Sequence, residues 1–342
     1  MNKILAIETS CDETAAAVTE GTRILSSVKW TQLEHGDWGG VVPSLARRVH
    51  EERIDGIAEQ ALSEAGCQIV DIGAIAVTVG PGLAIALEVG IRKAKELANK
   101  YKKPLIAVNH IEGHILSPLA MGAKPKFPAL ALVVSGGHTE LDLVSEIGKY
   151  KIIAEKIDDA LGEALDKAAR MLGIPYPGGA GLEKMAREGN SKAYPLPLPM
   201  AGREDQNQFS YSGLKTAMKR LVDQLSVNGS QLSEQMVNDL AAGFQHRAFE
   251  HLIRVTRKSI QNLGVDVHDL LVGGGVAANQ ELRSKILELG KELGIQVHFS
   301  PNELFGDNAA MIGIVAGFKA EKGQFVRDAI ELDRKPRWRV DA

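Results

Sequence analysis

The chain has 342 residues, 44% of them hydrophobic and 24% charged, and 40 Lys and Arg against 43 Asp and Glu give a formal net charge of −3. This length exceeds the size at which one hydrophobic core keeps growing, so two lobes are expected, and the composition excludes a largely disordered chain. The slightly acidic balance excludes a uniformly basic nucleic-acid binder, so any RNA contact must come from a local patch.

The cysteines and the first residues bear on the compartment. Cys11 and Cys67 offer no disulfide framework, which favours a reducing environment. The apolar stretch after Lys3 is too short for a signal-peptide core and ends at the acidic Glu8. No apolar run is long enough to span a bilayer. We therefore expect a cytoplasmic protein without a membrane association.

The first third of the chain alternates strands with helices. Three short apolar runs predict a β-meander, at residues 3–9, 15–19 and 23–29. Helical spacing follows over residues 43–62. A buried strand at 73–79 then meets a Gly-Pro-Gly turn, a helix that runs to about residue 100, and a further strand at 105–108. This alternation favours an α/β class with a partly parallel sheet.

A second meander begins near Pro128 and repeats the pattern of the first. Leu5 to Thr14 and Leu132 to Glu140 each read as a strand, a small polar turn and a strand, and a glycine and a third strand follow both. Two such units indicate a duplicated lobe with a cleft between the copies. The alternative is that the two hairpins resemble each other only because hairpins in general share this pattern.

The remainder of the chain is mostly helical. A proline-rich stretch at 173–205 predicts a long loop, which in a compact protein is usually functional or mobile. A buried strand at 270–272 runs into Gly273-Gly274-Gly275, and a helix is expected from about Ala277. Other helical patterns cover residues 160–172, 214–225, 233–263 and 308–322.

His110 and His114 lie four residues apart just after a buried strand. On a helix both imidazoles project from one face, which is a common way to chelate a transition metal, although such pairs are also found in purely structural helices. Pro118 predicts that this helix is short or bent. Glu112 lies roughly 200° around the helix from His110, so the pair is not the zinc-protease motif and lacks that motif's general base.

A metal site of this kind needs a third ligand, and Asp307 stands where a loop meets the last predicted helix. An aspartate there can also be explained as a helix N-cap, and the two roles can coexist. An open site of two histidines and a carboxylate suits Zn²⁺ or Fe²⁺.

Glycine turns predict places where the backbone approaches a ligand closely. Ser135-Gly136-Gly137 lies between two predicted strands and can form an anion nest, although most such turns are only tight hairpins. The glycines at 273–275 suit the approach of a flat ligand such as a base, and Asn279 could hydrogen-bond it or be a solvated helix residue.

Several acidic and basic residues remain open to two interpretations. Asp166 and Glu183 are candidate acceptors for ribose hydroxyls or plain surface charges. Asp12 and Glu13, at the tip of the first hairpin, suit either turn formation or proton transfer beside a metal. Two basic groups could meet RNA phosphates or be solvated: Arg247, Arg254 and Lys258 on one helical face, and Arg334, Lys335, Arg337 and Arg339 near the end.

These motifs, in this order, resemble the TsaD (Gcp/YgjD) family from the first strand to Arg337-Trp338. The resemblance is carried by Ile7 to Thr14, Gly39 to Pro43, Gly80 to Leu83, His110 to His114, Val134 to Thr139, Gly162 to Lys167, Tyr176 to Gly179, Ser212 to Thr216, Gly273 to Asn279, and Asp307 to Ile312. The archaeal and eukaryotic branch has a tyrosine and an asparagine where this chain has Val133 and His138. The chain is therefore similar to the bacterial or organellar branch. Phe305-Gly306 and Ala84-Ile85 depart from the usual pattern without touching an expected ligand.

The resemblance implies an α/β protein with the ASKHA (actin-like ATPase) fold, in which two ribonuclease-H-like lobes flank a central cleft. The expected N-terminal lobe is 1–115, completed by 308–330; the C-terminal lobe is 116–307, and a basic tail covers 331–342. The implied activity is metal-assisted transfer of threonylcarbamoyl from threonylcarbamoyl-AMP to N6 of the adenosine beside the anticodon in tRNAs reading ANN codons.

By motif, the resemblance implies a role for each candidate residue. His110, His114 and Asp307 would hold one divalent metal per subunit, Fe²⁺ first by family and Zn²⁺ second. Val134, Ser135, Gly136, Gly137 and His138 would bind the phosphate and carboxylate of the nucleotide (threonylcarbamoyl-AMP, or ATP/ADP), and Asp166, Gly179, Glu183 and Asn279 its adenosine. Apart from the resemblance, our own hypothesis is that Asp12, with Glu13, assists proton removal.

The implied partners are tRNA, a TsaB-like paralogue docking on the helices at 43–62 and 83–100, and a TsaE-like small ATPase, with a homodimer through the same helices as an alternative. Three rival functions are a small-molecule kinase of the same fold, a metalloprotease and a non-enzymatic nucleotide-dependent scaffold. The protease is disfavoured by the position of Glu112, and the scaffold by the presence of all three expected metal ligands.

Overall fold

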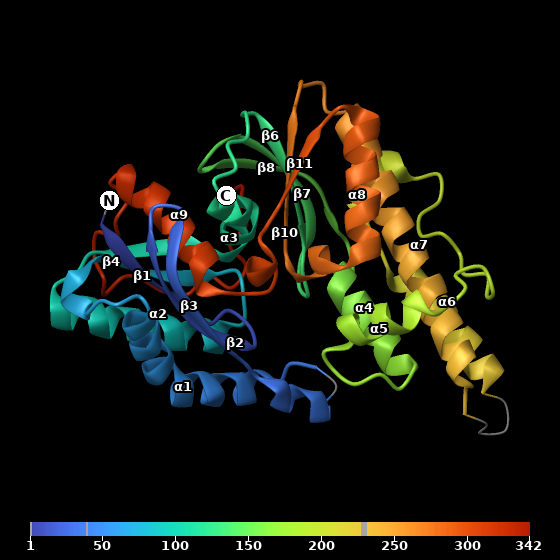
Figure 1. Ribbon diagram of the computed structural model, residues 1–342, viewed down its shortest axis with the longest axis horizontal. Coiled ribbons are helices and arrows are strands. Elements are labelled where there is room, and N and C mark those ends of the chain that lie inside the picture. Colours follow the sequence, from blue (N-terminus) through green and yellow to red (C-terminus); the bar gives the residue numbers. More distant parts are fainter. Residues whose placement is uncertain (1, 39, 227–230) are drawn as a thin grey trace.

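The computed structural model describes residues 2–38, 40–226 and 231–342. Two sheets, each with helices packed against it, form two lobes that lie side by side (Figure 1). None of the described helices is long and apolar enough to cross a bilayer.

The N-terminal lobe is built on a five-stranded sheet in the order β3-β2-β1-β4-β5. The strands β1 (Lys3–Glu8), β2 (Glu13–Glu20) and β3 (Arg23–Thr31) form the expected antiparallel meander. The strands β4 (Ile72–Gly80) and β5 (Leu105–Asn109) continue the sheet in parallel with β1. The helices α1 (Pro43–Glu64) and α2 (Ala84–Tyr101) pack on one face of this sheet.

The C-terminal lobe repeats this arrangement in its six-stranded sheet, whose order is β11-β10-β6-β7-β8-β9. The strands β6 (Ala129–Val134), β7 (Thr139–Glu146) and β8 (Lys149–Lys156) form the second antiparallel meander. The strands β10 (Asp269–Gly273) and β11 (Gln296–Phe299) extend it in parallel, as β4 and β5 do in the first lobe. The short β9 (Gln208–Phe209) adds an edge. The duplication expected from the two hairpins is therefore confirmed.

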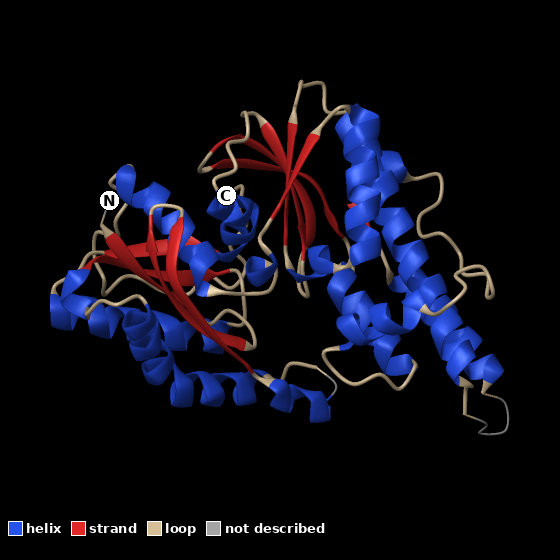
Figure 2. Ribbon diagram, in the orientation of Figure 1, coloured by secondary structure: helices blue, strands red, loops and turns tan. Residues whose placement is uncertain are grey.

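Helices cover the outer side of the second sheet (Figure 2). They are α4 (Leu161–Met171), α5 (Gly178–Arg187), α6 (Ser212–Leu225), α7 (Glu234–Gln261) and α8 (Gln280–Leu293). The expectation of an unbroken loop over 173–205 was wrong, because α5 lies within it. The sequence GGAGLEKMAR has poor helix formers in its first turn, so its helix depends on packing against α4 and α7.

Two helices lie between the sheets. The helix α3 (His110–Leu116) follows β5 directly, and α9 (Ala309–Glu321) packs against β1, β2 and α3. Residues of α3, α9 and both sheets share one hydrophobic cluster, so the two lobes are joined through a common apolar layer. The described residues also form short 3-10 turns at Leu33–Trp38, Ile69–Asp71, Ser117–Met121, Glu204–Gln206, Gly275–Ala278 and Asn302–Leu304.

Candidate metal centre and active-site cleft

The two histidines of the HxxxH pair project from one short, buried helix. Asn109 caps α3, since its Oδ1 accepts hydrogen bonds from the amides of Ile111 (2.8 Å) and Glu112 (3.3 Å). The rings of His110 and His114 are stacked edge to face with centroids 4.8 Å apart. The helix ends at Leu116 and continues as a 3-10 turn through Pro118, as the proline predicts.

Two glycines allow neighbouring elements to come close to this helix. Gly113, between the histidines, lies against Met311 and Ile312 of α9. Gly273, at the end of β10, lies so close to the carbonyl of His114 that a Cβ atom there would overlap it. The helix is thereby held between α9 and the second sheet, and its histidines face the loop before α9.

Asp307 comes from that loop and completes a three-residue cluster. Its Oδ1 lies 3.1 Å from Nε2 of His114 and 3.5 Å from Nε2 of His110. One ligand atom from each of the three side chains lies within 4.8 Å of the others. The alternative interpretation of Asp307 as the helix cap was wrong, because Asn308 caps α9 by accepting from the amide of Met311. The carboxylate of Asp307 is thus left to face the histidines.

Glu8, at the end of β1, orients the first histidine. Its Oε2 lies 3.1 Å from Nδ1 of His110, and Thr78 donates to the same oxygen. A carboxylate on Nδ1 leaves Nε2 of the ring turned toward Asp307, which is the usual arrangement behind a metal-binding histidine. Glu8 was not among the candidate residues that the sequence pattern indicated. Its only signal was an acidic residue closing a buried apolar strand.

The electrostatics of the cluster favour a cation. Burial alone would lower the pKa of His110, but Asp307 and Glu8 raise it well above the usual range. Burial alone would raise the pKa of Asp307, but His110 and His114 hold it well below the usual range. Positive charge is therefore stabilised at this point. Two imidazole nitrogens and one carboxylate oxygen are a donor set that fits Fe²⁺ or Zn²⁺.

Glu112 faces away from the cluster, as the helical geometry predicts. Tyr150 donates a hydrogen bond of 3.0 Å to its Oε1, and Lys319 lies 3.2 Å from its Oε2. Glu112 is occupied in holding α3 against β8 and α9. It has no geometry for acting as the base of a zinc protease.

The two acids of the first hairpin lie near the same cluster. Asp12 is 8% exposed, and its Oδ2 accepts a hydrogen bond of 3.0 Å from the Tyr176 hydroxyl. Burial raises the pKa of Glu13 well above its usual range, and the charges of Asp307 and Asp12 add to this effect. Glu13 therefore retains its proton under conditions in which an ordinary glutamate is ionised.

The glycine turn of the second hairpin lies beside the histidines. Val134 ends β6, the Ser135 amide donates to the carbonyl of His138, and the His138 amide donates to Oγ of Ser135. The exposed Gly136 and Gly137 have amides with no hydrogen bond to the described part of the chain. The ring centroids of His138 and His110 are 6.1 Å apart. Burial and the charge of His110 lower the pKa of His138 to about 3, so its imidazole is neutral.

The residues expected to contact adenosine form a connected group across three helices. Oδ1 of Asp166 accepts from the amides of Gly178 (2.8 Å) and Gly179 (2.9 Å). Oε1 of Glu183 accepts from the amide of Gln280 (3.1 Å). The helix expected from Ala277 begins at Gln280, and Asn279 is its N-cap. Neither Asp166 nor Glu183 is a freely solvated charge.

Asn279 differs from the expectation of a residue one turn inside a helix. Its Oδ1 accepts from the Leu282 amide, its Nδ2 donates to Oε1 of Gln245, and it is 6% exposed. The solvated interpretation is therefore wrong. The residues expected to begin the helix form the 3-10 turn Gly275–Ala278 instead, so Asn279 stands at the helix start.

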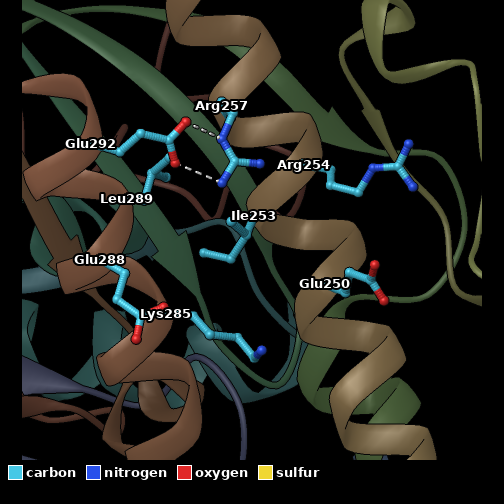
Figure 3. A pocket seen from close by; sticks show the side chains of 8 residues that line it. All are labelled: Glu250, Ile253, Arg254, Arg257, Lys285, Glu288, Leu289 and Glu292. Carbon is cyan, nitrogen blue, oxygen red and sulfur yellow. Dashed lines mark hydrogen bonds and ion pairs between the residues drawn. The ribbon is translucent and has the colours of Figure 1, made fainter.

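A hollow lies between α7 and α8. Its volume is about 390 Å³, and Figure 3 shows its lining of Glu250, Ile253, Arg254, Arg257, Lys285, Glu288, Leu289 and Glu292. Arg257 makes two 2.9 Å bonds to Glu292, and Arg254 pairs with Glu204. Arg247, on the same helix, pairs with Glu250. Arg247 and Arg254 were among the basic residues that could meet RNA phosphates. Both already pair with carboxylates of the chain.

Two duplicated lobes with a cluster of two histidines and a carboxylate between them define an ASKHA-fold protein with a candidate divalent-metal centre. The sequence model of TsaD, tRNA N6-adenosine threonylcarbamoyltransferase, matches residues 23–314. The chain belongs to the TsaD family.

Curated relatives agree with this assignment. The tRNA N6-adenosine threonylcarbamoyltransferase of Chelativorans sp. (strain BNC1) is 44% identical over 100% of this chain and 96% of its own length. That of Pelobacter propionicus is also 44% identical, over 99% of this chain and 97% of its own length.

Structural likeness to more distant proteins shows the fold alone. HypF of T. kodakarensis has a TM-score of 0.61 at 14% identity, covering 97% of this chain and 49% of its own. Component A of the Acidaminococcus fermentans (R)-2-hydroxyglutaryl-CoA dehydratase has a TM-score of 0.54 at 14% identity, covering 94% of this chain and 100% of its own.

Proposed function

We propose that this chain transfers the threonylcarbamoyl group from threonylcarbamoyl-AMP to N6 of the adenosine beside the anticodon in tRNAs that read ANN codons. The observation that carries the proposal is the convergence of His110, His114 and Asp307 beside the glycine turn at 134–138, in a chain of the TsaD family. The small-molecule kinase is disfavoured by this donor set, because Mg²⁺ prefers oxygen ligands.

One divalent metal per subunit, Fe²⁺ or Zn²⁺, would be held by His110, His114 and Asp307. When bound, such an ion polarises a carbonyl or phosphoryl oxygen and serves as a template for the reactants. Glu8 keeps the ring of His110 in the tautomer that leaves Nε2 available.

The nucleotide would lie along the glycine turn with its adenosine toward α5 and α8. Amides of the Ser135-Gly136-Gly137 turn suit the phosphate and the threonyl carboxylate, since exposed amides in a tight turn make a concave anion site. Adenosine would contact Asp166, Gly179, Glu183 and Asn279. His138 is neutral, so it neither attracts nor repels the phosphate by charge.

In the reaction, N6 of the tRNA adenosine attacks the carbamoyl carbon of the mixed anhydride. The new N–C bond forms, the C–O bond to phosphate breaks, and AMP leaves with the bonding electrons. The proton lost by N6 passes to the carboxylate of Asp12, with Glu13 next to it at the start of β2. An exocyclic amine is a poor nucleophile, so positioning of the two substrates contributes heavily.

Several further assignments belong to the same proposal. tRNA is the acceptor, and a TsaB-like paralogue would dock on α1 and α2, where a homodimer could form instead. A TsaE-like small ATPase would complete the system in the cytoplasm. The lobes would divide as 1–115 with 308–330, and 116–307, with 331–342 as a basic tail.

The test supplies unmodified tRNA, threonine, bicarbonate, ATP, the adenylate-forming enzyme and the partner proteins, followed by digestion of the tRNA and mass analysis of its nucleosides. The wild-type chain should yield N6-threonylcarbamoyladenosine. The double variant His110→Ala with His114→Ala should fold and yield none. His268→Ala, at an exposed histidine that lies beside Asp266, serves as control. Full activity of the double variant would end the metal assignment, and phosphorylation of a metabolite by ATP would favour the kinase.

A further inference from the structure

A tyrosine of the C-terminal lobe reaches across the cleft to an acid of the N-terminal lobe. The hydroxyl of Tyr176, in the loop between α4 and α5, donates to Oδ2 of Asp12 at 3.0 Å, although the two residues are 164 positions apart. The same loop also comes close to the N-terminal lobe at Gly36, since a Cβ atom placed there would lie 3.5 Å from the carbonyl oxygen of Tyr176. Figure 1 shows this loop extending toward the N-terminal lobe.

The position of Tyr176 is fixed by its own lobe. Directly after it, the amides of Gly178 and Gly179 donate to Oδ1 of Asp166 on α4. Gly178 also packs so tightly against the Cβ atom of Ala169 that no side chain would fit. The tyrosine therefore moves with α4 and α5, the helices that carry the proposed adenosine contacts.

The backbone of Asp12, in contrast, is fixed by the N-terminal lobe. Its carbonyl accepts from the amide of Gln32 at 3.0 Å. The carbonyl of the preceding residue, Cys11, lies 3.0 Å from Nε2 of His50 on α1. The N-terminal lobe thus sets where Asp12 is, while Tyr176 holds the direction in which its carboxylate points.

We propose that Tyr176 is a positioning residue for the transfer reaction, which acts by orienting the carboxylate of Asp12 when the two lobes are together. The proposal rests on the proposed role of Asp12 as proton acceptor. Holding Oδ2 on the phenol leaves Oδ1 to receive the proton from N6. Because the tyrosine belongs to the lobe that would bind the adenosine of the nucleotide, Asp12 is aligned only when that lobe is docked against the hairpin.

The experiment is a double-mutant cycle with Tyr176→Phe and Asp12→Asn, measured in the complete reconstituted system with threonylcarbamoyl-AMP and tRNA. Tyr176→Phe should lower kcat by about tenfold or more, because a hydrogen bond to a charged group is lost. The KM values for both substrates should change by less than about twofold, because the tyrosine touches neither of them in this scheme. In the Asp12→Asn background, Tyr176→Phe should have no further effect.

The controls separate the role of Tyr176 from the proposed role of Asp12 as proton acceptor. Tyr194→Phe removes a hydroxyl from a half-buried tyrosine of the same lobe and should keep the wild-type kcat. The thermal midpoint of Tyr176→Phe should match that of the wild type, and Tyr176→Ala should reproduce its loss of kcat. An unchanged kcat for Tyr176→Phe, a change confined to KM, or effects that multiply with those of Asp12→Asn would overturn the role of Tyr176. Full activity of Asp12→Asn would instead overturn the proton-transfer role of Asp12.

Discussion

Oε2 of Glu8 lies 3.1 Å from Nδ1 of His110, so the last residue of β1 orients the first residue of α3. The carboxylate is completely buried and also accepts hydrogen bonds from Thr78 and from the amide of Ser10. A buried carboxylate with this many donors must be ionised or nearly so. In agreement, the pKa of Glu8 is lowered, since His110 outweighs the effect of burial.

The first prediction concerns this pair. Glu8→Gln should weaken divalent-metal binding by about 10- to 100-fold, the usual effect of losing an acid behind a metal-binding histidine. Metal content after dialysis against graded chelator measures it. Glu112→Gln is the matched control, because Glu112 is a buried acid on the same helix that faces Tyr150 and Lys319 instead. Equal metal retention by both variants would contradict the role of Glu8.

The second prediction concerns the close approach of β10 to α3. Gly273→Ala would place a Cβ atom against the carbonyl of His114, so it should lower the free energy of unfolding by about 1–3 kcal/mol. Denaturant titration checks this value. Gly56→Ala, in the exposed part of α1 with open space around it, should instead raise the free energy of unfolding by about 0.5–1 kcal/mol. An unchanged free energy of unfolding for Gly273→Ala would contradict the prediction and show that α3 can shift to accommodate the Cβ atom.

The third prediction concerns acid stability. Burial lowers the pKa of His251 from 6.5 to about 4, outweighing the nearby Glu204 and Asp158. Between these two pKa values the unfolded chain binds a proton at His251 and the folded chain does not. The contribution of neutral His251 to the free energy of unfolding is therefore complete above pH 6.5 and is lost as the pH falls toward 4.

A His251→Gln variant tests this, because the amide can still accept from the amide of Ser210. Its free energy of unfolding should fall less steeply than that of the wild type between pH 6.5 and 4. The same dependence of the free energy of unfolding on pH in both proteins would contradict the prediction.

The fourth prediction has the opposite sign. Burial and Glu155 raise the pKa of Glu140 from 4.5 to about 7, and one of its oxygens has no hydrogen-bond partner within the described residues. Here the folded chain keeps a proton that the unfolded chain loses. The stabilising contribution is therefore present below pH 4.5 and is lost as the pH rises through about 7.

Glu140→Gln cannot ionise, so it should raise the free energy of unfolding relative to wild type above pH 7 and have little effect near pH 4.5. Denaturant titration of both proteins at pH 4.5 and above pH 7 measures the difference in the free energy of unfolding. The half-buried Glu155→Gln should show a smaller change, since Glu140 can still ionise, and loss of the Glu155–Arg339 ion pair offsets the gain from removing the neighbouring charge. A larger gain at pH 4.5 than above pH 7 would contradict the assignment.

Much of the fold could be predicted along the chain. The two meanders, the strands around them and the helix at 43–62 have short-range periodicity, and the structure confirms them. The helix α5 was missed because its glycine-rich start resembles a loop, and only packing against its neighbours stabilises it. Local preference left Asp307 open as the cap before α9, although Asn308 makes it, because it could not choose between the two adjacent residues.

Part of the candidate site could likewise be predicted from the sequence, and part could not. Four-residue spacing on one helix was enough to pair His110 with His114, and glycine spacing was enough to select the turn at 135–137. The sequence by itself determined these features because each depends on residues within one or two turns of one another. The contacts of Glu8 with His110 and of Tyr176 with Asp12 span 102 and 164 positions. Only the tertiary structure decided them, because they form where separate sheets and lobes pack together, and no local periodicity encodes that packing.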